Sequence, residues 1–209
     1  MTLNELAYNV LNKLSGGRST NNSYISLDQI KFNINYYRSL LLHRDLTKSQ
    51  LQDDYFYQEI DVPIDASGTS KIFVSTQDVP DFVHMYYQTP ARIYVEDSLY
   101  PLVTYNLHRM NSYARATKDA RRSYMLNNKL YLYEPTDTIT QLKLRAIFEN
   151  PTAAYVFNGI DEEAADDMPY PVSGDVAQRV SQSLINGDFE LFVKIPADIT
   201  TDNLPNLAQ

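Results

Sequence analysis

The chain has 209 residues, of which 44% are hydrophobic, and a formal net charge of −8, so it can bury one large core or two small ones. The absence of cysteine excludes disulfides, thiolate zinc sites and a cysteine nucleophile. The acidic balance argues against a general nucleic-acid binder, and no apolar run approaches the ~20 residues that span a bilayer, so we expect a soluble protein.

The first predicted helix follows Thr2. Thr2 and Glu5 have the spacing of a capping box, in which threonine accepts from the third backbone N–H and glutamate reaches back. Apolar residues then recur at helical spacing as far as Leu14. Gly16 and Gly17 are expected to stop this helix, because glycine tolerates the left-handed cap.

A second helix is predicted from Ser26, which forms another capping box with Gln29. Ile25 and Ile30 flank this cap at the spacing of a hydrophobic staple. We expect the helix to end near residue 44 or 45. It is apolar on more than one side, which indicates two packing neighbours.

The middle of the chain, roughly residues 55–157, is predicted to be mostly β. The clearest hairpin is "RRSYMLNNKLYLYEP", in which Asn127-Asn128 can take positive φ in a two-residue turn. In "ITQLKLRAIFENP", Leu142 and Leu144 alternate with polar residues, as in a half-buried strand. Residues 86–118 have no steady periodicity, and we expect long loops or short strands there.

A third helix is predicted near the C-terminus, capped by Ser173 or Asp175. Apolar residues share one face of it, with Asn186-Gly187 as a break and Pro196 as the end. The residues on this face are Val176, Val180 and Leu184, and Phe189 and Phe192 could extend it. After Pro196 we expect an extended tail that is disordered or held by a partner.

These elements predict an α+β fold. Two N-terminal helices and one C-terminal helix would form a small bundle, with a mostly antiparallel β region inserted between the second and third. The expected boundaries are 1–50 for the N-terminal helices, 51–160 for the β region, 161–195 for the C-terminal helix and 196–209 for the tail.

The stretch "GIDEEAADDMPYP" concentrates carboxylates without a basic residue. They are Asp161, Glu162, Glu163, Asp166 and Asp167. A solvated loop, a contact between subunits and a cation site are all consistent with this composition. The stretch lacks the alternating ligands and central glycine of a calcium loop, and a catalytic acid–base pair would need a pocket that separates two pKa values.

Other catalytic patterns are missing from the sequence. His43, His84 and His108 are scattered, "SGGR" lacks the Lys-Ser/Thr of a phosphate loop, and there is no G-x-S-x-G. We therefore expect neither an enzyme nor a metal or cofactor site.

A basic segment, "RMNSYARATKDARR", stands against this acidic one. It carries Arg109, Arg115, Lys118, Arg121 and Arg122. It could be a solvated loop, meet an acidic surface of a neighbouring subunit or contact DNA phosphates. One basic and one acidic segment suit head-to-tail packing of identical subunits, in which two different patches meet and can close a ring.

Several motifs in succession resemble a virion structural protein of crAss-like and related tailed phages. They are "YISLDQIKFNINYYRSLLLHRD", "YMLNNKLYLYEP", "LKLRAIFENPTAAYVF", "DDMPYPVSGDVAQRVSQSLINGDFELFV" and "PADITTDN". The resemblance runs from about Leu3 to Asn203, with its strongest part at "FENP" and "YP" and its weakest between Tyr55 and Lys118. Such proteins look like the head-to-tail connector, or adaptor, rings that join portal and tail.

The resemblance implies a helical bundle with an inserted β region, assembled as a twelve-subunit ring below the portal protein. It implies a place in the virion neck, assembly in the bacterial cytoplasm, and contacts with the next ring or tail protein. DNA would pass through without sequence-specific binding, and no membrane would be involved. The expected subunit or portal contacts are Arg115, Lys118, Arg121, Arg122, Asp161, Glu162, Glu163, Asp166, Asp167, Ile199 and Leu204. A divalent-cation-dependent enzyme using the acidic loop and a DNA-binding module using the basic segment remain the alternatives.

Overall fold

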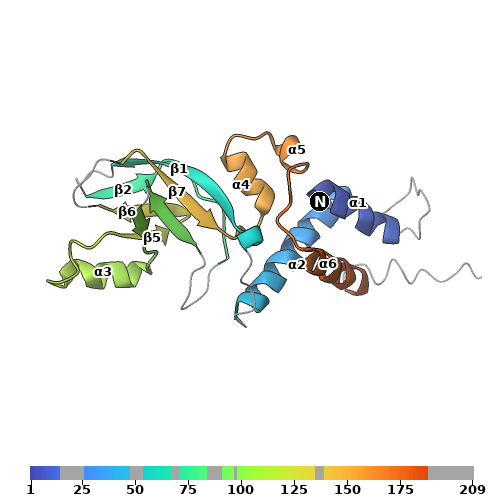
Figure 1. The fold of residues 1–209 in the computed structure, drawn as a ribbon, viewed down its shortest axis with the longest axis horizontal. Helices are drawn as coiled ribbons and strands as arrows, with labels where there is room; N and C mark the ends of the chain where they lie inside the picture. The colour runs from blue at the N-terminus through green and yellow to red at the C-terminus, as the bar shows by residue number, and fades with distance from the viewer. Residues whose placement is uncertain are drawn as a thin grey trace, which may run out of the picture.

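The computed structural model describes residues 1–14, 26–47, 54–66, 71–83, 91–96, 98–134 and 139–187. It confirms the α+β prediction. A seven-stranded sheet, curled into a nearly closed barrel, lies beside a group of helices formed by both ends of the described chain (Figure 1).

The helical part contains α1 (Leu3–Leu14), α2 (Leu27–Thr47) and α6 (Gly174–Asn186). Both α1 and α6 pack against α2, so the predicted bundle of N- and C-terminal helices is present. Leu6, Val10, Ile34, Val180 and Leu184 are among the residues of their shared core. Burial of such apolar side chains provides the main stabilisation of the bundle, since it removes them from water.

The predicted N-cap residues of these helices accept the expected hydrogen bonds, and at Thr2 both bonds of the capping box are present. The Thr2 hydroxyl accepts from the backbone N–H of Glu5 (3.1 Å), and the Glu5 carboxylate accepts from that of Thr2 (2.9 Å). Ser26 caps α2 by accepting from the N–H of Gln29 (3.1 Å). Ser173, rather than Asp175, caps α6.

Helix α2 continues to Thr47, slightly beyond the expected end. The predicted staple residue Ile25, the stop at Gly16 and Gly17, and the extension to Phe189 and Phe192 lie outside the described residues.

The barrel has the strand order β4-β3-β7-β1-β2-β6-β5. In chain order, its strands are β1 (Gln58–Ala66), β2 (Ile72–Ser75), β3 (Arg92–Val95), β4 (Ser98–Tyr100), β5 (Arg122–Leu126), β6 (Lys129–Tyr133) and β7 (Gln141–Ala146). Every strand pair is antiparallel. Beyond β4, Leu102 forms a parallel bridge with Ser123 of β5, so the two edge strands nearly close the sheet. This contact reduces the unpaired edge, which would otherwise be open to other chains.

Alternation of side chains places the second core inside the barrel. Ile60, Val62 and Ile64 of β1 are buried, as are Leu142 and Leu144 of β7, which confirms the half-buried strand. The predicted hairpin is also confirmed, because Asn127 and Asn128 have φ values of 50° and 57° between β5 and β6. Asparagine tolerates this left-handed region better than most residues.

Three helices were not predicted. Helix α3 (Tyr105–Tyr113) lies where loops or short strands were expected, and α4 (Pro151–Phe157) lies where β structure was expected. Helix α5 (Glu162–Ala165) occupies the acidic stretch. The buried residue of α3 is the polar His108, and the apolar residues Leu107, Met110 and Tyr113 are exposed, so the side of the helix that packs on the barrel carries no apolar periodicity. For α4 a local signal existed, since Asn150 accepts from the N–H of Thr152 and Pro151 occupies the first turn.

Arg38 joins the barrel to the helices. Its side chain on α2 is fully buried, and its guanidinium donates to the carbonyl oxygens of Phe148 (2.8 Å) and Pro171 (3.0 Å). The same group lies over the ring of Tyr170, 5.5 Å from its centroid. Because Phe148 follows β7 and Pro171 precedes α6, one side chain fixes three segments relative to one another.

Candidate functional site

The described ranges contain no group of three or more histidine, aspartate or glutamate side chains arranged to hold a metal ion. The carboxylates of the acidic segment divide instead into two sets with different surroundings.

The later part of the acidic segment is bound within the subunit. Asp166 accepts from the ammonium group of Lys31 (2.6 Å) in a partly buried pair, and Asp167 accepts from the side-chain amide of Asn4 (2.6 Å). Ala165, the last residue of α5, is also buried. These contacts attach α5 to α2 and α1.

The earlier part faces outward. The carboxylates of Asp161, Glu162 and Glu163 are exposed, and Asp161 makes no side-chain capping bond to α5. Three carboxylates at the start of a helix interact favourably with its dipole, and they leave a local acidic surface.

The basic segment is divided in the same way. Arg122 is 2% exposed, and its guanidinium donates to the carbonyl oxygens of Thr117 and Ala120 (both 2.9 Å). It also donates to Nδ1 of His108 (3.0 Å) and lies 4.3 Å from the centroid of the Tyr133 ring. Arg122 therefore organises the turn after α3 and is not available to a partner.

The other cations of this segment differ in their contacts. Arg121 pairs with the buried carboxylate of Glu134 (2.9 Å), which also accepts from the hydroxyl of Tyr100. Lys118 and Arg115 are exposed, with Lys118 in a weak 4.0 Å pair with Asp119. The sequence could not reveal this division, because the acceptors of Arg122 are backbone carbonyls.

His108 has a lowered pKa because it is buried and faces the charged Arg122. The imidazole is therefore neutral at neutral pH, and its Nδ1 can accept from Arg122. His108 also lies against the ring of Tyr124, with the centroids 4.2 Å apart. This set of contacts fixes α3 on the barrel.

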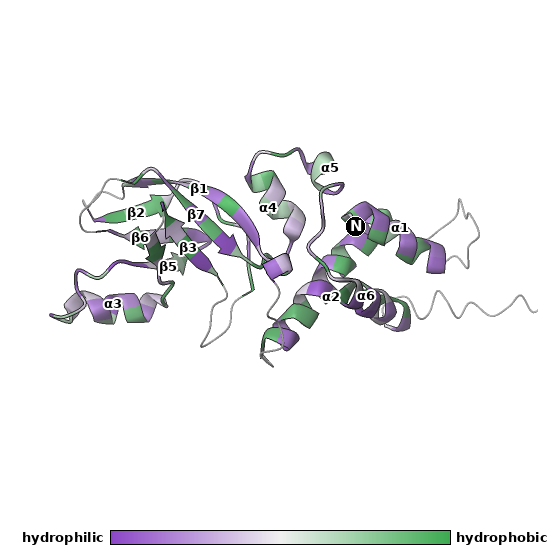
Figure 2. Ribbon diagram, in the orientation of Figure 1, coloured by the Kyte–Doolittle hydropathy of each residue, from purple (hydrophilic) through white to green (hydrophobic). Residues whose placement is uncertain are grey.

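A stripe of large apolar residues on α2 was not identified as a site from sequence. Phe32, Tyr36 and Leu40, here called the α2 stripe, are between 52% and 69% exposed. Their spacing of four places them on one face of the helix, and Figure 2 shows hydrophobic stretches continuing along α2. The prediction that α2 is apolar on several sides was correct, but α1 and α6 cover only part of it. Contiguous exposed apolar groups mark interaction surfaces.

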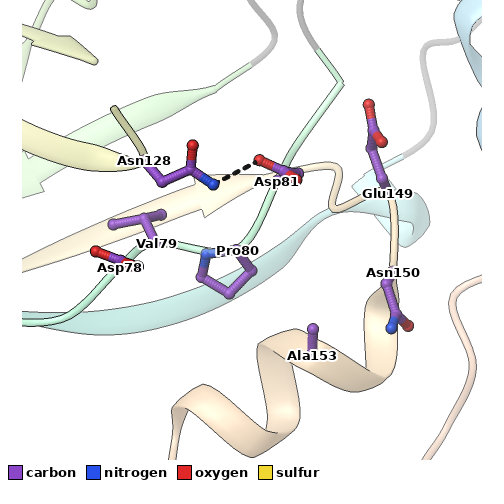
Figure 3. Close-up of a pocket in the computed structure, with 8 residues that line it drawn as sticks. All are labelled: Asp78, Val79, Pro80, Asp81, Asn128, Glu149, Asn150 and Ala153. Atoms are coloured by element: carbon purple, nitrogen blue, oxygen red, sulfur yellow. Dashed lines mark hydrogen bonds between the residues drawn. The ribbon is translucent and has the colours of Figure 1, made fainter. Parts of the chain in front are cut away.

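Two open clefts meet beside this stripe. One, of about 430 Å³, is lined by the α2 stripe and by Asn35, Ser39, His43, Glu149 and Asn150. The other, of about 390 Å³, is lined by Asp78, Val79, Pro80, Asp81, Asn128, Glu149, Asn150 and Ala153 (Figure 3). Since Glu149 and Asn150 belong to both, we call the pair the junction groove. It is apolar at the α2 end and carries carboxylates at the barrel end.

A second apolar surface lies on α3. Leu107, Met110 and Tyr113 are exposed, and the exposed fractions of Met110 and Tyr113 are 69% and 83%. Arg109 and Arg115 are exposed beside them. We call these five residues the α3 patch; it combines apolar and cationic groups.

None of the described helices combines the length and the apolar character that crossing a membrane requires. No curated protein matches the chain. A family model described as phage tail ring protein 2 matches residues 5–206, nearly the whole chain. The chain therefore belongs to this family of crAss-like phage ring proteins, as its resemblance indicated.

Proposed function

We propose that the protein forms a ring in the head-to-tail connector of the virion, where it extends the portal channel and docks a tail component, without catalysis. Membership of a tail ring family supports a structural role. The observation that carries the proposal is the pair of unlike exposed apolar surfaces on one subunit, the α2 stripe and the α3 patch. Head-to-tail contacts need two different surfaces of this kind, and such contacts close into rings.

The proposed ring has twelve subunits and assembles on the portal. Subunits would remain monomeric or weakly associated until the portal brings them together. The segment after Pro196, including Ile199 and Leu204, lies outside the described residues. We propose that it binds the portal or a neighbouring subunit.

The charged residues have separate proposed roles. Arg115 and Lys118 contribute to the subunit contact, whereas Asp161, Glu162 and Glu163 contribute negative charge to the channel. An acidic channel repels the DNA backbone and so lets DNA pass without sticking, in agreement with the net charge of −8. Arg121, Arg122, Asp166 and Asp167 are bound within the subunit and are left out of this contact.

The ring is tested by electron microscopy of virion necks and by native mass spectrometry of the protein mixed with portal. We expect twelve copies between portal and tail. A variant truncated after Pro196 should keep its fold and fail to enter particles, while a control with a Gly/Ser tail of equal length should fail in the same way. If the truncated variant enters particles normally, the tail does not dock; if the protein is absent from the neck, the ring function itself is wrong.

A further inference from the structure

We infer that the α3 patch of one subunit docks into the junction groove of a second copy of the chain. This inference rests on the proposed ring and names the two surfaces that meet in it.

The two surfaces match in their apolar parts. The α3 patch presents Leu107, Met110 and Tyr113 from one side of a helix whose other side, at His108, is packed on the barrel. The groove offers the α2 stripe as a complementary apolar wall. An amphipathic helix that lays its apolar face into a hydrophobic groove is a common mode of protein recognition.

The two surfaces also match in charge. Asp78, Asp81 and Glu149 line the barrel end of the groove. Asp78 pairs with Lys129 (2.9 Å), but Asp81 accepts from the uncharged amide of Asn128 (3.2 Å), so the groove keeps a net negative charge. The α3 patch brings Arg109 and Arg115. Opposite charges at the rim of an interface favour encounter in one orientation.

The arrangement of the subunit favours a second copy as the occupant. Helix α3 lies at the end of the barrel remote from α2, so the patch and the groove of one subunit are far apart (Figure 1). The contact is therefore between copies, and it joins unlike surfaces, so each subunit can donate to one neighbour and accept from another.

The acidic surface of α5 is a poorer partner for the α3 patch. Its outward residues Asp161, Glu162 and Glu163 can pair with arginine, but they offer no apolar wall for Met110 and Tyr113. The junction groove has both chemistries side by side, so it accounts for both halves of the patch.

The absence of cysteine makes the contact directly testable by cross-linking. A Met110→Cys/Leu40→Cys double variant, treated with a short bismaleimide at a concentration where native mass spectrometry records wild-type oligomers, should give a ladder of covalent multimers. An equimolar mixture of the two single variants should stop at dimers, because each has only one reactive surface. The matched control is Met110→Cys/Tyr8→Cys, since Tyr8 is about as exposed as Leu40 but lies on α1. This control should give no ladder.

A second arm measures association without a cross-linker. Met110→Ser/Tyr113→Ser and Leu40→Asp should each weaken self-association at least about tenfold, since buried aromatic anchors dominate interface energies. Their mixture should form heterodimers and nothing larger. Leu99→Ser, which removes an exposed leucine from β4 outside the patch, is the control and should assemble as wild type does.

The outcomes separate the contact from the ring. If wild-type protein forms rings and the double-cysteine variant gives only the product level of the Tyr8 control, the docking is overturned and the ring function stands. If the α3 variant is monomeric while the groove variant still forms homodimers, α3 packs against α3 and the docking is also overturned. Wild-type protein that never associates, alone or with portal, would overturn the ring and the docking together.

Discussion

Replacement of Arg38 tests how the barrel is held to the helices. The fully buried guanidinium donates to two backbone carbonyls and lies over Tyr170, and its Nη2 atom has no hydrogen-bond partner in the described part of the structure. Burial lowers the pKa of Arg38, because the interior disfavours the charged form. Two effects therefore oppose one another when the charge is removed.

The stabilisation lost with these contacts should exceed the desolvation free energy that is recovered when the buried charge is removed. Hydrogen bonds to a charged group contribute roughly 1.5–3 kcal/mol each, and the orphaned carbonyls of Phe148 and Pro171 would stay buried. Relief of the buried charge offsets part of this, so we expect Arg38→Met to lower the free energy of unfolding by about 2 kcal/mol. Arg38→Ala adds a cavity and should lose about 4 kcal/mol.

The assay is thermal and urea unfolding of both variants. For a chain of this size about 1 kcal/mol corresponds to ~2–4 °C in Tm, so we expect losses of roughly 4–8 °C for Arg38→Met and 8–16 °C for Arg38→Ala. Arg44→Met, an exposed change on the same helix, should remain within about 0.5 kcal/mol of wild type. An Arg38→Met variant as stable as wild type, or more stable, would refute the reasoning, since desolvation would then be the larger effect.

Substitution of Tyr170, His108 and Asp166 tests the surroundings of three more side chains. Burial raises the pKa of Tyr170 above its ordinary value of 10. The free energy of unfolding should therefore fall as the pH rises above 10, because the tyrosine ionises first in the unfolded chain, and below pH 10 this group should cause no loss. Tyr170→Phe should flatten this fall in urea titrations at high pH. Burial and the charge of Arg122 lower the pKa of His108 below its ordinary value of 6.5. The free energy of unfolding should therefore fall as the pH drops below 6.5, because the histidine is protonated first in the unfolded chain. His108→Asn, which keeps a hydrogen-bond acceptor, should reduce this loss, and an unchanged pH dependence would contradict the assigned environment. Asp166→Asn should cost about 1 kcal/mol by removing a partly buried pair with Lys31, whereas Glu162→Gln should be neutral; equal effects in urea unfolding would contradict the division of the acidic segment.

Local signals in the sequence were enough to predict much of the fold. The capping box at Thr2, the cap at Ser26 and the turn at Asn127-Asn128 each depend on residues within a few positions of one another. Alternation in β7 and helical spacing in α6 also depend only on which face is buried. The family, too, was recognisable from the order of short motifs.

The roles of the charged residues required the tertiary structure. Arg122 and Arg115 look equivalent in the sequence, yet one binds backbone carbonyls inside the subunit and the other is exposed. Likewise Asp166 meets Lys31, which is distant in the chain, while Glu162 faces outward. A charged side chain is paired within the subunit or exposed to solvent according to which groups the fold brings within hydrogen-bonding distance. Sequence spacing does not specify this.

The candidate contact surfaces also depend on which distant segments the tertiary structure brings together. The sequence determined that α2 is apolar on more than one side, but not which side α1 and α6 would leave uncovered. The junction groove exists only because Asp81, Asn128 and Glu149, from separate segments, come together beside α2. Closure of the barrel through Leu102 and Ser123 is equally non-local. Helix and strand identity follow from short-range periodicity, whereas surfaces arise from long-range packing, which buries one face and exposes another.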